Sequence, residues 1–337
     1  MIHSLLTTRS YTRFQQQTEI RDDIRGSQSF FHSPPLPPTP EDEQFARLRL
    51  LRSRRVGIST YKRLLIEHGT AQNALAALPE VARAAGVAGY EICPEGVVRA
   101  ELRAAHAAGA KLLQIEHLDY PTSLAELDDA HPFLWLLGDP ALLARPMIAL
   151  VGARNASSLG TRMARTLAHD WGEAGFVVVS GLARGVDAAA HLAALPYGTI
   201  AVQAGGVDVM YPAENTKLGE DIAAQGLRLS EQPMGLQPTA RYFPKRNRII
   251  SGLAQATVVV EAAAKLGSLI TARDALDQGR DVMAVPGHPF DARASGGNML
   301  IHDGATLVRN AADILEALDT MQGEVSQLPL VPPAPHP

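Results

Sequence analysis

Cysteine and long apolar runs are scarce in this sequence. Cys93 is the only cysteine among 337 residues, which excludes a disulfide scaffold and an all-cysteine metal site. A single cysteine suits the reducing cytosol, so we expect a cytoplasmic protein. No apolar run approaches the roughly 18 residues of a membrane span, and the first 30 residues lack the apolar centre of a secretory signal. The sequence therefore predicts no membrane partner.

Charge of either sign is not in large excess. Thirty-one Lys and Arg residues stand against 35 Asp and Glu residues, which gives a formal net charge of −4. This balance excludes a basic, histone-like coat and argues mildly against a polyanionic partner. Hydrophobic residues make up 46% of the chain, enough for a sizeable core, and the length predicts about two domains.

Proline-rich segments mark both ends of the chain. Residues 1–40 are polar and end in closely spaced prolines, which predicts a disordered tail and a stiff linker. Thr39 and Pro40 then have the residue types of a helix cap and a first helical position. Residues 321–337 form a second Pro-rich tail, which we interpret as a linker whose following domain is absent.

Residues 41–110 predict a small helical domain. Short apolar faces are separated by Gly57 and Gly69, residues 71–78 and 79–85 are predicted as two helices, and a helix over 97–108 ends at Gly109. The pattern resembles a helix-hairpin-helix or sterile-alpha-motif-like module. Arginines are frequent between positions 47 and 63. They form either a solvated face or a nucleic-acid contact, and a helical cap without a ligand is equally compatible.

Residues 111–320 predict a doubly wound α/β domain. Apolar, β-branched runs at 132–138, 148–151, 176–179, 199–202, 256–260 and 281–285 alternate with helical segments. Such alternation indicates a mainly parallel sheet with helices on both faces. Ligands bind at the carboxyl ends of the strands in these sheets.

Glycine-rich loops follow the strands predicted at 148–151 and 176–179. The loop at 152–157 offers backbone amides, a hydroxyl and Arg154 at a helix start, which suits a phosphate. The alternative is an ion pair between Arg154 and a carboxylate. The loop at 180–187 offers Ser180 and Arg184 in the same way. Asp187 and His191 stand four residues apart on one helix face, where a structural role is favoured over acid–base chemistry or metal binding.

A third segment, 241–252, interleaves four cations with two aromatic residues. Single-stranded nucleic acid needs this mixture, because cations bind phosphates and ring faces stack on bases. A solvated basic loop is the alternative. Further helix starts at 265–268 and 295–298 add Lys265 and more small residues. The five segments together indicate a polyanionic ligand, and the missing Gly-x-x-x-x-Gly-Lys-Ser/Thr motif argues against an ATP motor.

These segments, in order across residues 110–317, resemble the DNA processing protein A family (DprA, also called Smf). The matching pieces are Val151-Gly-Ala-Arg154, Ser180-Gly-Leu-Ala-Arg-Gly-Val-Asp187-Ala-Ala-Ala-His191, Gly206-Val-Asp208-Val-Met-Tyr211-Pro212-Ala-Glu-Asn215, Phe243-Pro-Lys-Arg-Asn-Arg-Ile-Ile-Ser-Gly252, residues 261–272, Ala284-Val-Pro-Gly287 and Gly297-Asn298. Ala204 stands where the family more often has glycine. Many members also carry a C-terminal winged-helix-like domain, whereas this sequence stops in the Pro-rich tail, so we expect either a member without that domain or a longer full protein.

The resemblance implies a small helical domain before an extended Rossmann-like domain. It also implies a homodimer that binds single-stranded DNA and loads the RecA recombinase onto it in natural transformation, without catalysis, metal or cofactor. The candidate DNA contacts are Gly152, Arg154, Ser157, Ser180, Gly181, Arg184, Gly185, Arg241, Phe243, Lys245, Arg246, Asn247, Arg248, Lys265, Gly267 and Ser268.

An enzyme is the alternative. Lysine-decarboxylase-like phosphoribohydrolases share the Rossmann-type sheet and would use Glu261, Arg154 and Ser180 on a nucleoside monophosphate. This chain lacks their Gly-Gly-x-Gly-Thr loop. The cations gather at the strand ends while many acidic residues lie elsewhere, so the net charge of −4 is compatible with one local cationic groove.

Overall fold

The computed structural model describes residues 40–263 and 267–318. The predicted tail over 1–40 lies outside the described residues except for Pro40, where the first helix begins. The cap predicted at Thr39, the residue Lys265 and the tail over 321–337 lie outside them as well. No helix in the described ranges is long and apolar enough to cross a membrane.

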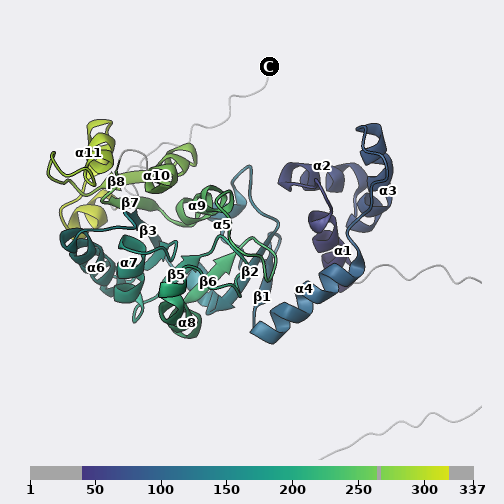
Figure 1. The fold of residues 1–337 in the computed structure, drawn as a ribbon, viewed down its shortest axis with the longest axis horizontal. Helices are drawn as coiled ribbons and strands as arrows, with labels where there is room; N and C mark the ends of the chain where they lie inside the picture. The colour runs from purple at the N-terminus through teal and green to yellow at the C-terminus, as the bar shows by residue number, and fades with distance from the viewer. Residues whose placement is uncertain (1–39, 264–266, 319–337) are drawn as a thin grey trace, which may run out of the picture. The chain divides into compact units, whose positions relative to one another are not determined.

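The helical domain comprises α1 (Pro40–Arg52), α2 (Ile58–His68), α3 (Ala71–Ala84) and α4 (Glu95–Ala108), drawn in purple to blue in Figure 1. The prediction of separate helices over 71–78 and 79–85 is wrong, because α3 continues through Pro79. Proline removes one intrahelical hydrogen bond. Leu75, Leu78 and Ala82 are nevertheless buried along the helix, and this packing outweighs the lost bond.

One sheet of nine strands forms the second domain, and its strand order is β1-β2-β6-β5-β4-β3-β7-β8-β9. Strands β3 to β9 pair in parallel, whereas β2 pairs antiparallel with both β1 and β6. The predicted doubly wound, mainly parallel α/β architecture is confirmed. The strands are β1 (Lys111–Gln114), β2 (Phe133–Gly138), β3 (Met147–Gly152), β4 (Val177–Ser180), β5 (Thr199–Val202), β6 (Leu227–Ser230), β7 (Ala256–Val260), β8 (Asp281–Ala284) and β9 (Thr306–Leu307).

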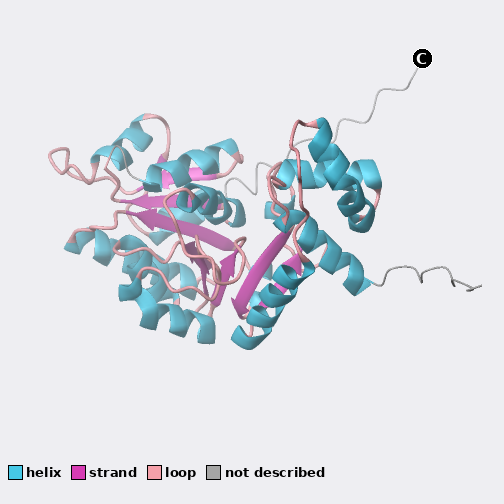
Figure 2. Cartoon of the chain, turned by 45° about the vertical axis from the view of Figure 1, so that its right-hand side comes forward, coloured by secondary structure: helices cyan, strands magenta, loops and turns pink. Residues whose placement is uncertain are grey.

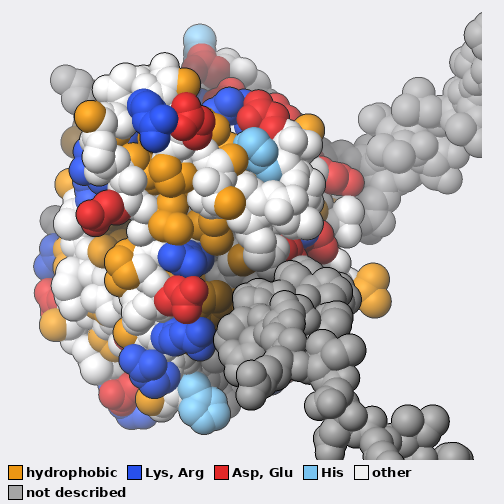
Figure 3. Space-filling model, turned by 90° about the vertical axis from the view of Figure 1, so that its right-hand side faces the viewer, with side chains coloured by type: hydrophobic (Ala, Val, Ile, Leu, Met, Phe, Trp, Pro, Cys, Tyr) orange, Lys and Arg blue, Asp and Glu red, His pale blue; other side chains and the backbone are white. Residues whose placement is uncertain are grey.

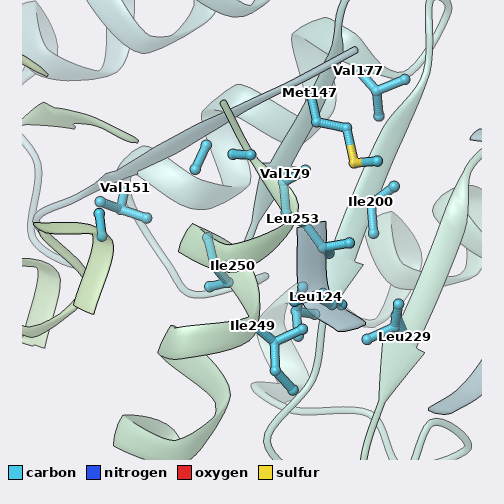
Figure 4. Close-up of a cluster of buried hydrophobic side chains, with 14 of the residues drawn as sticks. Leu124, Met147, Val151, Val177, Val179, Ile200, Leu229, Ile249, Ile250 and Leu253 are labelled. Carbon is cyan, nitrogen blue, oxygen red and sulfur yellow. The ribbon is translucent and has the colours of Figure 1, made fainter. Parts of the chain in front are cut away.

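Helices cover both faces of this sheet (Figure 2). On one face α6 and α7 bury Leu167, Trp171 and Ala190 against the alternate residues of the central strands. On the other face α9 buries Ile249, Ile250 and Leu253 (Figure 4). The helices of this domain are α5 (Thr122–Ala125), α6 (Ser158–Glu173), α7 (Val186–Ala194), α8 (Thr216–Gln225), α9 (Tyr242–Leu253), α10 (Gly267–Asp277) and α11 (Ser295–His302), with short 3₁₀ turns at Pro140–Ala144 and Ala213–Asn215.

The largest difference from the sequence-based prediction is α9. The basic segment 241–252 is a helix and not a loop, and seven of its residues are buried. Strands β1, β6 and β9 were also not predicted. Strand β6 contains the buried Arg228, which interrupts the apolar run, and β9 consists of two exposed residues.

Candidate nucleic-acid interface

The loops that follow β3, β4 and β5 meet at one edge of the sheet, because parallel neighbouring strands end on the same side. The first turn of α9 joins them there. Two adjoining hollows of about 390 and 430 Å³ are found at this edge, and Arg154, Ala183, Phe243 and Arg246 line both. The first three predicted segments therefore form one surface.

On this surface Arg154 is exposed and Phe243 is half-buried. The guanidinium of Arg154 lies 5.3 Å from the centre of the Phe243 ring, and Phe243 packs on Tyr211 with 5.6 Å between ring centres. Arg154 is exposed, and no carboxylate oxygen of the described residues lies within 4 Å of its guanidinium. The alternative of an ion pair at Arg154 is therefore not seen, and its charge faces solvent.

Arg246 lies beneath this surface and is only 5% exposed. It donates hydrogen bonds to the carbonyls of Gly181 and Val202, 2.5 and 2.6 Å away. Burial lowers the pKa of Arg246 to about 10, while the nearby Asp187 carboxylate opposes that shift. Its guanidinium attaches α9 to the ends of β4 and β5, and a direct DNA contact by Arg246, which lines both hollows, stays a prediction.

Asp187 and His191 stabilise the loop after β4. The Asp187 carboxylate accepts hydrogen bonds from the amides of Gly181 and Ala183. His191 Nε2 accepts from the amide of Leu182, and its Nδ1 faces the Thr199 hydroxyl at 2.7 Å. Burial lowers the pKa of His191 to about 3, so the ring is neutral. These contacts support the structural role and leave no free acid–base pair.

Two predicted contacts at the strand ends, Ser180 and Ser157, are used within the protein. The Ser180 hydroxyl is fully buried and donates to the Leu150 carbonyl, so its prediction as a phosphate contact is wrong. Ser157 caps α6, and both its amide and its hydroxyl bind the carboxylate of Glu261. The N-terminus of α6, predicted to receive a phosphate, therefore already holds an anion.

The glycines of these loops allow close packing of the backbone. A Cβ atom on Gly152 would lie 1.9 Å from the Val260 carbonyl oxygen, and one on Gly181 would lie 2.3 Å from a guanidinium nitrogen of Arg246. Gly185 has a φ of +77° and would bring a Cβ to 2.2 Å from the Ala153 oxygen. These glycines position the loops, whereas the predicted direct contact with DNA at Gly152, Gly181 and Gly185 stays a prediction.

The start of α10 contributes polar groups to the 430 Å³ hollow. Asn247 and Ser268 line it together with Gly267 and Thr271, and the Asn247 amide donates to the Gly267 carbonyl at 3.2 Å. The Ser268 hydroxyl is buried and has no hydrogen-bond partner within the part of the chain that the structure describes. Ser268 thus lines the hollow that Arg154 also lines, but its hydroxyl oxygen is buried.

Of the remaining predicted cations that the structure describes, Arg184 alone lines one of these two hollows. Arg184 lines the 390 Å³ hollow and lies 3.7 Å from Glu214 in an exposed ion pair. Arg248 pairs with Asp129 and Glu231 at 3.0 and 2.5 Å, and its contact with DNA stays a prediction. Arg241 stacks on Tyr242, 4.8 Å from its ring centre, and Lys245 lines a different hollow.

Comparison with known proteins identifies the family. Residues 111–319 match the model of DNA recombination-mediator protein A, and residues 41–104 match that of the DprA-like N-terminal HHH domain. The chain belongs to the DprA family. The match to the HHH model also decides between the two predicted types of helical module in favour of the helix-hairpin-helix.

Two curated DprA proteins are similar to this chain. DNA processing protein DprA of Streptococcus pneumoniae is 44% identical over 198 residues, which cover 58% of this chain and 70% of the relative. The Bacillus subtilis protein of the same name is 41% identical over 213 residues, which cover 62% of this chain and 72% of the relative. The predicted family resemblance is confirmed.

Two solved DprA structures share the fold. The Streptococcus pneumoniae structure aligns with a TM-score of 0.68 and 34% identity, covering 81% of this chain and 97% of that one. The Helicobacter pylori DprA structure, described with a single-stranded DNA binding mode, aligns with a TM-score of 0.58 and 30% identity. The alignment covers 63% of this chain and 96% of that one.

Tyr211 was not predicted from the sequence as a site residue, although it lies on the surface beside Phe243. It lines the 390 Å³ hollow, is 47% exposed and packs against Phe243. The sequence signal was the matched segment around residue 211, which places an aromatic residue after β5.

A metal centre is not part of this edge of the sheet. Among the described residues, His169, Asp170 and Glu173 form the one group whose ligand atoms lie within 4.8 Å of one another. All three are exposed on the last two turns of α6, whereas the hollows adjoin the opposite end of that helix. The expectation that the protein uses no metal or cofactor stays a prediction.

Proposed function

We propose that the protein binds single-stranded DNA at the surface formed by Arg154, Phe243 and Tyr211, and that it acts as a recombination mediator without catalysing a reaction. The observation that supports this most is the exposed Arg154 guanidinium beside the Phe243 ring, with no carboxylate of the described residues within 4 Å. A cation and a ring at this spacing suit one phosphate and one base of the same strand.

Single-stranded DNA fits this surface better than duplex DNA. Ring stacking requires a base face, and the faces are covered by neighbouring base pairs in a duplex. Coating of a duplex depends mainly on many phosphate contacts, whereas the chain has a net charge of −4. The Helicobacter pylori relative, with its described single-stranded DNA binding mode, supports the same substrate.

The finer proposal is that the protein is a cytoplasmic homodimer that loads RecA onto incoming single strands during natural transformation. Its support is membership of the family of DNA recombination-mediator protein A. The enzymatic alternative is not favoured by the site. Two of its three proposed groups are engaged, because Ser180 is buried and the Glu261 carboxylate binds the amide and hydroxyl of Ser157.

Binding of a fluorescent oligothymidylate across a salt series tests the proposal. We expect Arg154→Ala to weaken binding by about 1–3 kcal/mol and to reduce the salt slope by about 0.7, the value for one phosphate contact on a single strand. Phe243→Ala should weaken binding with little change in slope, because stacking is not ionic. Arg165→Ala, which removes an exposed arginine on α6, is the control.

Unchanged affinity and slope in Arg154→Ala would contradict the proposed site. The finer proposal is tested by RecA ATPase activity on single strands already covered by a single-strand-binding protein. We expect the wild type to shorten the lag and Arg154→Ala to restore it. Release of base from nucleoside monophosphates by the wild type would instead support the enzyme.

A further inference from the structure

A third hollow, of about 390 Å³, lies along another face of α9, and we call it the α9 groove. Tyr242, Lys245 and Arg248 line it from α9, and their spacing of three residues places them on one helix face. Phe243, Pro244 and Asn247, in contrast, line the 430 Å³ hollow at the DNA surface. The first turn of α9 therefore borders both the α9 groove and the proposed DNA surface.

The opposite wall of the α9 groove comes from the helix-hairpin-helix domain. Leu51 and Arg52 end α1, Val56 and Gly57 belong to the turn, and Ile58 begins α2. The first turn of α2 contains no acidic residue, so nothing there repels a phosphate. The helical domain and the sheet domain thus border one groove.

Most cations of the helical domain are already neutralised. Arg47, Arg49 and Arg52 pair with Glu43, Glu95 and Glu101, in that order. Figure 3 shows Lys and Arg side chains lying beside Asp and Glu side chains on the side of the molecule where this domain is found in Figure 1. This pairing fits the solvated face, one of the two interpretations of the arginine-rich segment.

Some cations at the α9 groove are without such a pair among the described residues. The two carboxylates of the groove, Asp129 and Glu231, both bind Arg248. Lys245 is exposed, and no carboxylate oxygen in the described part of the chain lies within 4 Å of its ammonium group. Arg54 and Arg55, in the turn just before Val56, are exposed and equally without such a pair. Lys245 thus lines the groove without an ion pair within 4 Å, although its charge lowers the pKa of the nearby Glu231 against the larger effect of burial. Arg54 and Arg55 lie in the turn that leads to the groove lining at Val56, and Arg54 also lines the neighbouring hollow beside Tyr90.

We propose that the single strand bound at Arg154 and Phe243 continues over the first turn of α9 into the α9 groove. Lys245 and the turn between α1 and α2, with Arg54 and Arg55, bind its next phosphates there. This inference rests on the proposed function and extends it, because it makes the helix-hairpin-helix domain a second part of the DNA site. Phosphates attract uncompensated cations in a groove more strongly than paired ones.

Oligothymidylates of two lengths test the extension. One of about 5 nucleotides fills the surface at Phe243, and one of about 20 nucleotides also reaches the groove, since single-strand sites span about 4–16 nucleotides per domain. In the double variant Arg54→Gln/Arg55→Gln we expect about ten-fold weaker binding of the long strand, a salt slope smaller by about 1.4, and unchanged binding of the short one. Lys245→Gln should lower the slope for the long strand by about 0.7.

The double variant Arg103→Gln/Arg165→Gln is the matched control, because it removes two exposed arginines outside the groove that also have no carboxylate oxygen of the described residues within 4 Å. It should bind both strands as the wild type does. Equal long-strand binding by Arg54→Gln/Arg55→Gln and the wild type would overturn the extension and leave the proposed function standing. A wild-type protein that bound neither strand would overturn both.

Discussion

Arg154 and Arg246 both belong to the predicted DNA contacts, but the fold gives them opposite environments. Arg154 is exposed beside Phe243, whereas Arg246 is buried and binds two backbone carbonyls. Burial lowers the pKa of Arg246 to about 10, and its charge is still present at neutral pH. One arginine is available to a ligand and the other stabilises the protein, a difference that residue type alone does not reveal.

His191 predicts a specific pH dependence of stability. Its pKa is lowered by burial to about 3, against about 6.5 in an unfolded chain. The unfolded chain therefore binds the extra proton first, and the stability due to the neutral ring is complete above pH 6.5 and lost as the pH falls towards 3. His131, whose pKa burial also lowers to about 3, acts in the same direction.

Urea unfolding of His191→Gln between pH 7 and pH 4 checks this. We expect the variant to be less stable at pH 7 by about 1–3 kcal/mol, since the Leu182 amide and the Thr199 hydroxyl lose their partner. On acidification the free energy of unfolding of the variant should fall less steeply than that of the wild type. The two slopes should differ by at most about 1.4 kcal/mol per pH unit. His302→Gln, at an exposed position, should follow the wild type. Parallel curves for His191→Gln and the wild type would contradict the assignment.

Among the helices and strands, α9 was located by its sequence pattern but was predicted with the wrong secondary structure. Its motif was found because cations and aromatic residues alternate there, but a loop was predicted. The helix forms because Ile249, Ile250 and Leu253 pack into the core below the sheet (Figure 4). Strands with uninterrupted apolar runs, such as β5 and β7, were predicted with the bounds that the structure has, because burial on both faces leaves a continuous signal.

Gly181→Ala tests how α9 is attached to the sheet. The added Cβ would lie 2.3 Å from a guanidinium nitrogen of Arg246, and we expect it to displace that side chain from the Gly181 and Val202 carbonyls. The free energy of unfolding in urea should fall by about 1–3 kcal/mol. Gly96→Ala, where nothing lies within 4 Å of the new Cβ in α4, should be neutral or slightly stabilising. Unfolding of Gly181→Ala at the wild-type urea concentration would refute this attachment.

At the scale of the whole molecule, the helical domain and the sheet domain share buried residues. Phe133 and Trp135 of β2 lie in the same apolar cluster as Leu64 and Leu78 of the helices. Trp135 also donates a hydrogen bond to Glu101, whose two carboxylate oxygens receive bonds from Arg52. The α9 groove depends on this arrangement, because its walls come from both domains.

Glu101→Gln should therefore destabilise the described fold as a unit. The side chains of Arg52 and Glu101 are 11% and 6% exposed, and removing one partner of a buried pair costs about 3–5 kcal/mol. Calorimetry should show one transition, shifted to lower temperature. Glu80→Gln, which breaks an exposed pair with Arg83, should cost under about 1 kcal/mol. A separate early transition in wild type would show that the shared core does not couple the two domains.

The sequence by itself determined the family, the alternation of strands and helices, and the edge of the sheet where the loops gather. These follow from apolar periodicity and from the order of short motifs, which are local properties of the chain. Only the tertiary structure decided which polar groups remain available to a ligand. Ser180, Ser157, Arg246 and Arg248 are used by partners at least 17 residues away in the chain, because burying a polar group requires a hydrogen bond or an opposite charge. Arg154 remained without an ion pair, since no described carboxylate lies near it.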